Sequence, residues 1–169
     1  MGYCMSMRDS KIRIPASKHD RCLAAIRALS GRGTAYYSSG GHYSWVRTHE
    51  FANATTLREA LAAWRWVDPN QDLTNPDNDK SKDIEELYFS GEKLGDDFIL
   101  MNAIAPYVEA GSYIEMVGEG AWLGPGADYW RWYFDGEGCI EQAGQVVYTV
   151  EDFDRSKERT YTIEEDDKK

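Results

Sequence analysis

Residues 127–138 read ADYWRWYFDGEG, and this stretch decides the fold. Its side chains alternate as on a β-strand, so one face would carry Trp130, Trp132 and Phe134, and the other Tyr129, Arg131 and Tyr133. The Asp135-Gly136 pair that follows is typical of a hairpin turn. The stretch therefore predicts an antiparallel hairpin in which two tryptophans point the same way.

The segments on either side of the hairpin extend it into a meander. Residues 113–117 alternate with a period of two before it, and residues 137–142 and 145–150 continue the alternation after it. Near the start of the chain, the apolar residues Met5 and Met7 occupy odd positions, whereas Ile12 and Ile14 occupy even positions. We therefore expect a bulge or a turn at residues 9–10, and a further strand at residues 84–90.

Helices are predicted between these strands. The first begins near Ser17, which has the character of an N-cap. The second begins at Thr56, which forms a capping box with Glu59, and it ends at Pro69. The third covers residues 96–110.

Helices early and an antiparallel meander late indicate an α+β fold. We expect one domain over residues 1–150, an antiparallel β-meander with about three helices packed on one face, and a charged tail at residues 151–169. The length of 169 residues and the hydrophobic fraction of 42% fit such a domain. No apolar run of about 18 residues occurs, so no membrane span is expected. The three cysteines, Cys4, Cys22 and Cys139, are odd in number and widely spaced, which indicates reduced thiols in a cytoplasmic protein.

The net charge of −10 is unevenly distributed. Residues 1–67 carry 10 basic and 4 acidic side chains, whereas residues 68–97 carry 3 basic and 10 acidic ones. An acidic surface repels nucleic acid and attracts a basic protein or a nucleic-acid-binding protein, although it can also serve solubility alone. The acidic candidates for such binding are Asp77, Asp79, Asp83, Glu85, Glu86, Asp96 and Asp97.

The aromatic residues allow two interpretations. The tryptophan face of the hairpin suits a core, whereas Tyr129, Arg131 and Tyr133 have the composition of an interface hot spot if they are exposed. They also suit a solvated sheet face stabilised by cross-strand pairs. Trp66 follows Trp64 by two residues, so both cannot share one helix stripe, and Trp66 either packs at the helix end or offers a stacking platform.

Few residues are typical of catalysis. His19, His42 and His49 lack metal-ligand spacing such as HExxH, and the cysteines form no CxxC pair, so neither a metal nor a cofactor is expected. Adjacent carboxylates leave a small carboxylate- or His-dependent hydrolase as an alternative. The acidic residues at positions 96–97 need no catalytic explanation, because acidic side chains stabilise the N-terminus of a helix.

Residues 84–142 contain GEKLGDDFILMNAIAPYVEAGSYIEMVGE, followed by WRWYFDGEGCIE. This segment resembles small uncharacterised proteins of bacteriophages and other mobile elements, in which a polar turn precedes a Trp-Arg strand and an aromatic hairpin. The resemblance implies a phage-type accessory protein in the bacterial cytoplasm and assigns no functional residue.

These observations favour a non-enzymatic acidic binding protein, such as an inhibitor of a host defence or nucleic-acid-processing protein. Its binding candidates are the acidic residues above together with Trp66, Tyr129, Arg131 and Tyr133. The alternatives are the small hydrolase and a small-ligand or carbohydrate-binding module that stacks its ligand on exposed aromatic residues.

Overall fold

The computed structural model describes residues 4–31, 43–71, 81–119 and 129–144. A four-stranded antiparallel sheet in the order β1-β4-β5-β6 forms one side of the molecule. Its strands are β1 (Cys4–Lys11), β4 (Ser112–Glu119), β5 (Tyr129–Phe134) and β6 (Cys139–Gly144). The α+β class and the antiparallel meander are confirmed, because β4, β5 and β6 are neighbours both in the sequence and in the sheet.

A bulge in β1 keeps the apolar side chains of this strand and of the residues just after it on one side. β1 pairs with β4, and the register shifts between Met7 and Asp9, which confirms the irregularity expected nearby. The shift moves the inward side from odd to even positions. As a result Met5 before the bulge and Ile12 and Ile14 after it are all buried.

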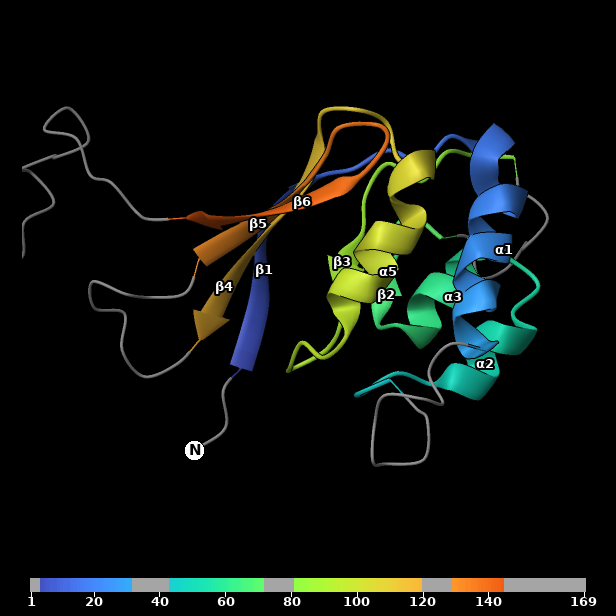
Figure 1. The fold of residues 1–169 in the computed structure, drawn as a ribbon, viewed down its shortest axis with the longest axis horizontal. Coiled ribbons are helices and arrows are strands. Elements are labelled where there is room, and N and C mark those ends of the chain that lie inside the picture. Colours follow the sequence, from blue (N-terminus) through green and yellow to red (C-terminus); the bar gives the residue numbers. More distant parts are fainter. Residues whose placement is uncertain (1–3, 32–42, 72–80, 120–128, 145–169) are drawn as a thin grey trace, which may run out of the picture.

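All the helices described lie on one side of this sheet, with α5 nearest to it (Figure 1). A second, two-stranded sheet of β2 and β3 lies beside α5. The helices are α1 (His19–Ala28), α2 (Thr48–Asn53), α3 (Leu57–Ala63) and α5 (Asp97–Ile104), and the short strands are β2 (Trp66–Val67) and β3 (Tyr88–Phe89). The helix α2 was not predicted.

Local signals at the helix ends were only partly predictive. The capping box is confirmed: Thr56 Oγ1 accepts from Glu59 N, and the Glu59 side chain accepts from Thr56 N. The prediction that Ser17 caps the first helix is wrong, because Ser17 lies in a 3₁₀ turn and α1 begins two residues later with no side-chain cap. The prediction that the second helix ends at Pro69 is also wrong. This helix, α3, ends at Ala63, because Arg65 takes a positive φ of 70° and turns the chain out of the helix.

Two other elements are shorter than predicted. The third helix ends at Ile104, and Pro106 follows in the 3₁₀ turn Ala105–Tyr107. In the strand expected at residues 84–90, Ile84 forms an isolated bridge with Ile14, and only β3 pairs regularly, with β2. The predictions for residues 145–150 and for the tail fall outside the described residues.

The core lies between the sheet and the helices. Trp132 and Phe134 of β5 are buried in it, as the alternation predicted. The ring of Trp66 lies 5.9 Å from that of Trp132, which joins the two-stranded sheet to the large one. A second aromatic group holds the helices together, with the Trp64 ring 5.5 Å from Phe51 and 4.9 Å from Tyr43.

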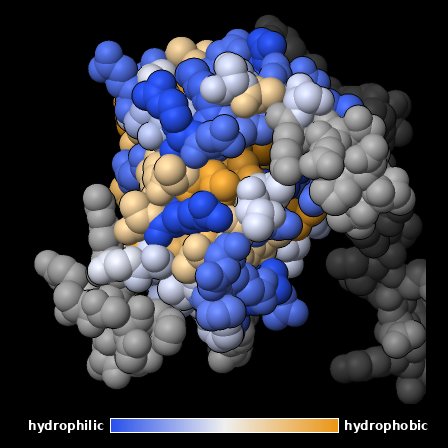
Figure 2. Space-filling view, turned by 90° about the vertical axis from the view of Figure 1, so that its right-hand side faces the viewer, coloured by the Kyte–Doolittle hydropathy of each residue, from blue (hydrophilic) through white to orange (hydrophobic). Residues whose placement is uncertain are grey.

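The outer side of the helical layer is mostly hydrophilic. Figure 2 shows the side of the molecule on which α1 lies, where hydrophilic residues surround a smaller hydrophobic centre. This is the expected pattern for helices that turn their apolar faces toward a sheet. Within the described part of the chain, no helix is long and apolar enough to cross a membrane.

Candidate binding surface on the open sheet face

The four-stranded sheet has a second face on which no described helix packs (Figure 1). The strand register arranges the outward side chains of this open face in three rows across the sheet. The first row holds Lys11, Tyr113, Tyr133 and Ile140, the second Asp9, Glu115, Arg131 and Gln142, and the third Ser6, Val117, Tyr129 and Gly144. A charged row therefore lies between two rows that carry the tyrosines.

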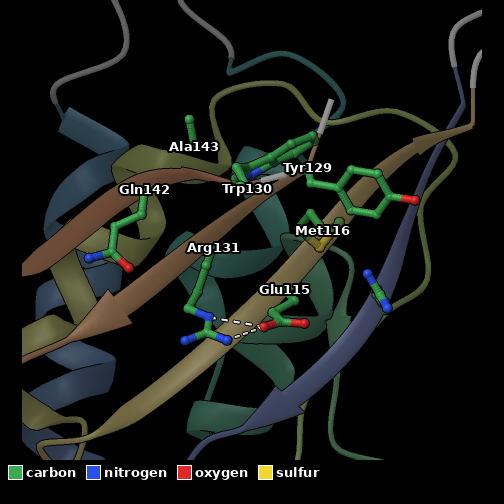
Figure 3. A pocket seen from close by; sticks show the side chains of 9 residues that line it. Glu115, Met116, Tyr129, Trp130, Arg131, Gln142 and Ala143 are labelled. Atoms are coloured by element: carbon green, nitrogen blue, oxygen red, sulfur yellow. Dashed lines mark hydrogen bonds and ion pairs between the residues drawn. The ribbon is translucent and has the colours of Figure 1, made fainter. Parts of the chain in front are cut away.

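The charged row is internally paired. Arg131 on β5 donates from Nε to Glu115 Oε1 at 3.0 Å, and its Nη2 donates to the same oxygen (Figure 3). Its guanidinium carbon also lies 4.5 Å from the centre of the Tyr113 ring. The Tyr113 hydroxyl in turn donates to Asp9 Oδ2 at 2.9 Å. These bonds raise the pKa of Arg131 and of Tyr113, each mainly through its own hydrogen bond to a carboxylate.

A shallow cavity of about 240 Å³ opens at the end of this face (Figure 3). Tyr129, Arg131 and Gln142 contribute to its lining from β5 and β6. Arg8, the residue at the β1 bulge, places its guanidinium 5.4 Å from the Tyr129 ring centre. The structure thus brings Tyr129, Arg131 and Tyr133 together on one partly exposed surface, as the sequence predicted for this strand.

The acidic candidates that the structure describes do not form part of this surface, and some of them have structural partners. Asp83 accepts from the Ala16 backbone N–H at 2.8 Å and from Arg13 Nη2 at 2.9 Å, and these two bonds, the first above all, lower its pKa. Asp96 accepts from the Ser44 backbone at 2.7 Å. Glu85 and Glu86 are exposed just before β3. Asp77 and Asp79 lie outside the described residues.

Two candidates cannot meet a partner at all. Asp97 is fully buried, where it accepts from Arg65 Nη2 and from Trp66 Nε1, both at 2.9 Å. Burial raises the pKa of Asp97, whereas these donors oppose that shift. Trp66 is also fully buried, so the prediction of a stacking platform is wrong for it. The left-handed turn at Arg65 directs the chain, and Trp66 with it, into the core.

The groups that a hydrolase would use are dispersed among the described residues. His19 is buried with Nε2 3.2 Å from the Ile14 carbonyl oxygen, His49 is exposed on α2, and His42 lies outside the described residues. Cys22 is buried, and burial raises its pKa to about 12, which disfavours a reactive thiolate. No group of three or more metal-ligating side chains occurs in the described ranges.

Comparison of the chain with protein-family models, curated proteins and solved structures finds no match. The function therefore has to be inferred from the chain's own geometry. Sequence reasoning missed Glu115 as the partner of Arg131, although the alternation of both strands and a hairpin register would have placed the two opposite each other.

Proposed function

We propose that this protein is a non-enzymatic binding protein that recognises another protein through the open face of its sheet. The observation that carries the proposal is the position of Arg131, fixed by Glu115 and stacked on Tyr113, between the tyrosine rows. Tyrosine and arginine dominate binding energies at protein interfaces. Side chains already fixed before binding lose less entropy when a partner arrives.

The net charge supports a partner with a basic surface, such as a nucleic-acid-binding protein. The open face itself carries nearly equal numbers of positive and negative charges. Its basic residues are Arg8, Lys11 and Arg131, and its acidic residues are Asp9 and Glu115. The excess of acid lies elsewhere: residues 81–119 carry 2 basic and 9 acidic side chains. We assign the long-range attraction to this excess and the close contacts to the open face, because net charge mainly accelerates encounter.

The resemblance to phage proteins extends this proposal to a cellular role. The protein would act in the cytoplasm of a bacterial host and inhibit a defence or nucleic-acid-processing protein. Direct binding of nucleic acid is not part of the proposal, because a net charge of −10 opposes it.

Affinity capture from bacterial lysate at low and high salt tests the proposal. Tyr133→Ala removes a tyrosine of the open face, and Tyr88→Ala is its matched control, because Tyr88 is 54% exposed on β3 and outside the three rows. We expect the same protein to be retained by the wild type and by Tyr88→Ala, less of it at high salt, and little by Tyr133→Ala. Failure to retain any protein at low salt, or equal retention by both variants, contradicts the proposal.

A further inference from the structure

The strand β6 forms one edge of the four-stranded sheet (Figure 1). It pairs with β5 along its whole length, from Cys139 to Gly144, and no strand among the described residues pairs with its other side. Residues 140–144 are all exposed, and the apolar Ile140 is 46% exposed. Unpaired backbone groups along such an edge are a template for another extended chain.

The hairpin turn determines which backbone groups of β6 point outward. Asp135 N donates to Gly138 O at 3.3 Å, so these two residues form a hydrogen-bonded pair. Bonded and non-bonded pairs alternate along an antiparallel ladder, so the next pair, Phe134 and Cys139, is a non-bonded one. The backbone of Phe134 agrees, because its O accepts from Gly111 N at 2.8 Å, just before β4. The N–H and C=O groups that point away from β5 are therefore those of residues 139, 141 and 143.

The opposite edge of the sheet carries protection that β6 lacks. On β1, Met5 N donates to Glu92 O at 2.8 Å, and the bulge between Met7 and Asp9 interrupts the strand. The register of β6 has no shift, and the strand contains no proline, no basic residue and only one charge, Glu141. Bulges, prolines and charges are what keep other chains from pairing with the edges of natural sheets. The β6 edge is thus open to an added strand.

Two observations indicate what kind of chain suits this edge. The three rows of the open face end on β6, at Ile140, Gln142 and Gly144, so a fifth strand would extend that surface. On the other side of β6, Glu141 accepts from Trp132 Nε1 at 2.8 Å, and no described lysine or arginine pairs with it. A basic segment would supply the missing counter-charge, whereas a second copy of this chain would bring another net charge of −10.

We propose that a partner protein adds an extended basic segment to β6 as a fifth strand, with a basic side chain facing Glu141 and an apolar one beside Ile140. This inference rests on the proposed function, because the partner that contacts the open face supplies the segment. In strand addition the backbone hydrogen bonds provide affinity, and alternate side chains provide specificity. Here the bonds would form at residues 139, 141 and 143.

Amide hydrogen exchange in the free, full-length protein tests whether the edge is open. Amides that point to solvent exchange faster than amides bonded within a sheet. We expect fast exchange at residues 141 and 143 and slow exchange at residues 140 and 142. Equal protection of both sets would overturn the proposal, because the edge would then already be occupied. The occupant would be a second copy if the protection depends on protein concentration, and otherwise the chain itself.

Titration of the isotope-labelled full chain with the peptide acetyl-Thr-Val-Lys-Val-Thr-amide tests the binding. The sequence reads the same in both directions, so it fits an antiparallel or a parallel strand. We expect saturable changes and new protection that are largest at the amides of residues 139, 141 and 143. The peptide with glutamate in place of lysine should bind about two- to fivefold more weakly, as for an exposed ion pair. No saturable change at these amides, or equal binding of both peptides, contradicts the proposal.

A proline on the edge isolates the backbone contribution. Ala143→Pro removes an N–H that points away from β5, which an edge strand tolerates, and Ala143→Val is the matched control that keeps this N–H. Ala143→Pro should bind the peptide about three- to tenfold more weakly than Ala143→Val, as for one lost hydrogen bond. Methylation of the lysine backbone nitrogen in the peptide should have a similar effect without any change to the protein. If neither change weakens binding, the proposal fails.

Capture from lysate separates this inference from the proposed function. Loss of the same protein from both Tyr133→Ala and Ala143→Pro, but not from Ala143→Val, supports both. If Ala143→Pro retains a protein that Tyr133→Ala loses, the open face binds a partner but β6 adds no strand. If the peptide binds β6 while no protein is retained from lysate, the strand site stands and the proposed function fails.

Discussion

Arg131 and Glu115 lie directly opposite each other on β5 and β4, and both Nε and Nη2 of the arginine donate to one carboxylate oxygen. Their side chains are 42% and 25% exposed, so the pair lies at the surface of the sheet rather than inside it. The second carboxylate oxygen of Glu115 and one guanidinium nitrogen have no role in this bond (Figure 3). The pair thus fixes the arginine and still leaves polar atoms for a partner.

Arg131→Ala should therefore affect binding far more than stability. A part-exposed ion pair contributes less than about 1 kcal/mol to folding, so the free energy of unfolding in urea should change by no more than this. An arginine at an interface hot spot contributes about 2 kcal/mol or more to binding. Affinity for the captured partner should fall by about thirtyfold or more, measured by isothermal titration calorimetry. A variant that loses stability but keeps affinity would assign Arg131 to the fold alone.

Arg58 and Asp68 form a buried ion pair, and breaking it should destabilise the protein strongly. Arg58 Nε donates to Asp68 Oδ2 at 2.7 Å, and the two side chains are only 4% and 2% exposed. Arg58→Met leaves Asp68 buried without its counter-charge, which typically costs about 3–5 kcal/mol. We expect a loss of this size in the free energy of unfolding, measured by urea titration with circular dichroism.

Two comparisons separate burial from the mere presence of a pair. Arg58→Met combined with Asp68→Leu should recover much of the loss, because no uncompensated charge remains buried. Glu50→Gln breaks the ion pair between Glu50 and Arg47, in which the Arg47 side chain is 58% exposed and the Glu50 side chain 50%. This change should lower the free energy of unfolding by less than about 1 kcal/mol. Equal losses for Arg58→Met and Glu50→Gln would contradict this account of the interior.

Thr56 and Ser17 offer a test of which helix signal in the sequence forms a cap. Thr56→Ala removes the acceptor for Glu59 N and should lower the free energy of unfolding by about 1 kcal/mol. Ser17→Ala removes no cap bond and should stay within about 0.5 kcal/mol of the wild type. Both values come from urea titration. A loss of stability for Ser17→Ala as large as that for Thr56→Ala would show that Ser17 acts as a helix cap after all.

Features governed by neighbours in the sequence were predictable. The alternation in β5, the turn at Asp135-Gly136 and the box of Thr56 and Glu59 each depend on residues within about four positions. So did the grouping of Tyr129 with Arg131 on one face. For these features the local pattern and the observed structure agree.

Features governed by distant residues were not predictable. Trp66 and Asp97 are 31 residues apart, yet both are buried, and the Asp97 carboxylate accepts from Trp66 Nε1 and from Arg65 Nη2. The end of α3 depends on the positive φ of Arg65, which no glycine signals. Phe98 and Trp130 line one pocket, and only the packing of α5 against the sheet brings them together. The local sequence pattern around a residue does not predict contacts with residues that are distant in the sequence.

His19 should make folding stability sensitive to pH. It is buried, and burial lowers its pKa from the ordinary value of 6.5. Below that value the unfolded chain takes up a proton on His19 that the folded chain does not yet bind. The free energy of unfolding should therefore fall as the pH drops below about 6.5, with a slope of at most about 1.4 kcal/mol per pH unit from this residue.

The difference between the wild type and His19→Gln isolates this contribution. Both proteins keep Asp97, so titration of this carboxylate cancels when free energies of unfolding from urea titration are subtracted at each pH. Asp83, whose charge acts on His19, has a lowered pKa and is ionised throughout this range. The wild type should lose stability relative to His19→Gln between pH 7 and pH 5, because only the wild type binds the extra proton when unfolded. His49→Gln, an exposed position on α2, is the control for removal of a histidine in general. A constant difference between the wild type and His19→Gln across this range would show that the folded protein protonates His19 as readily as the unfolded chain.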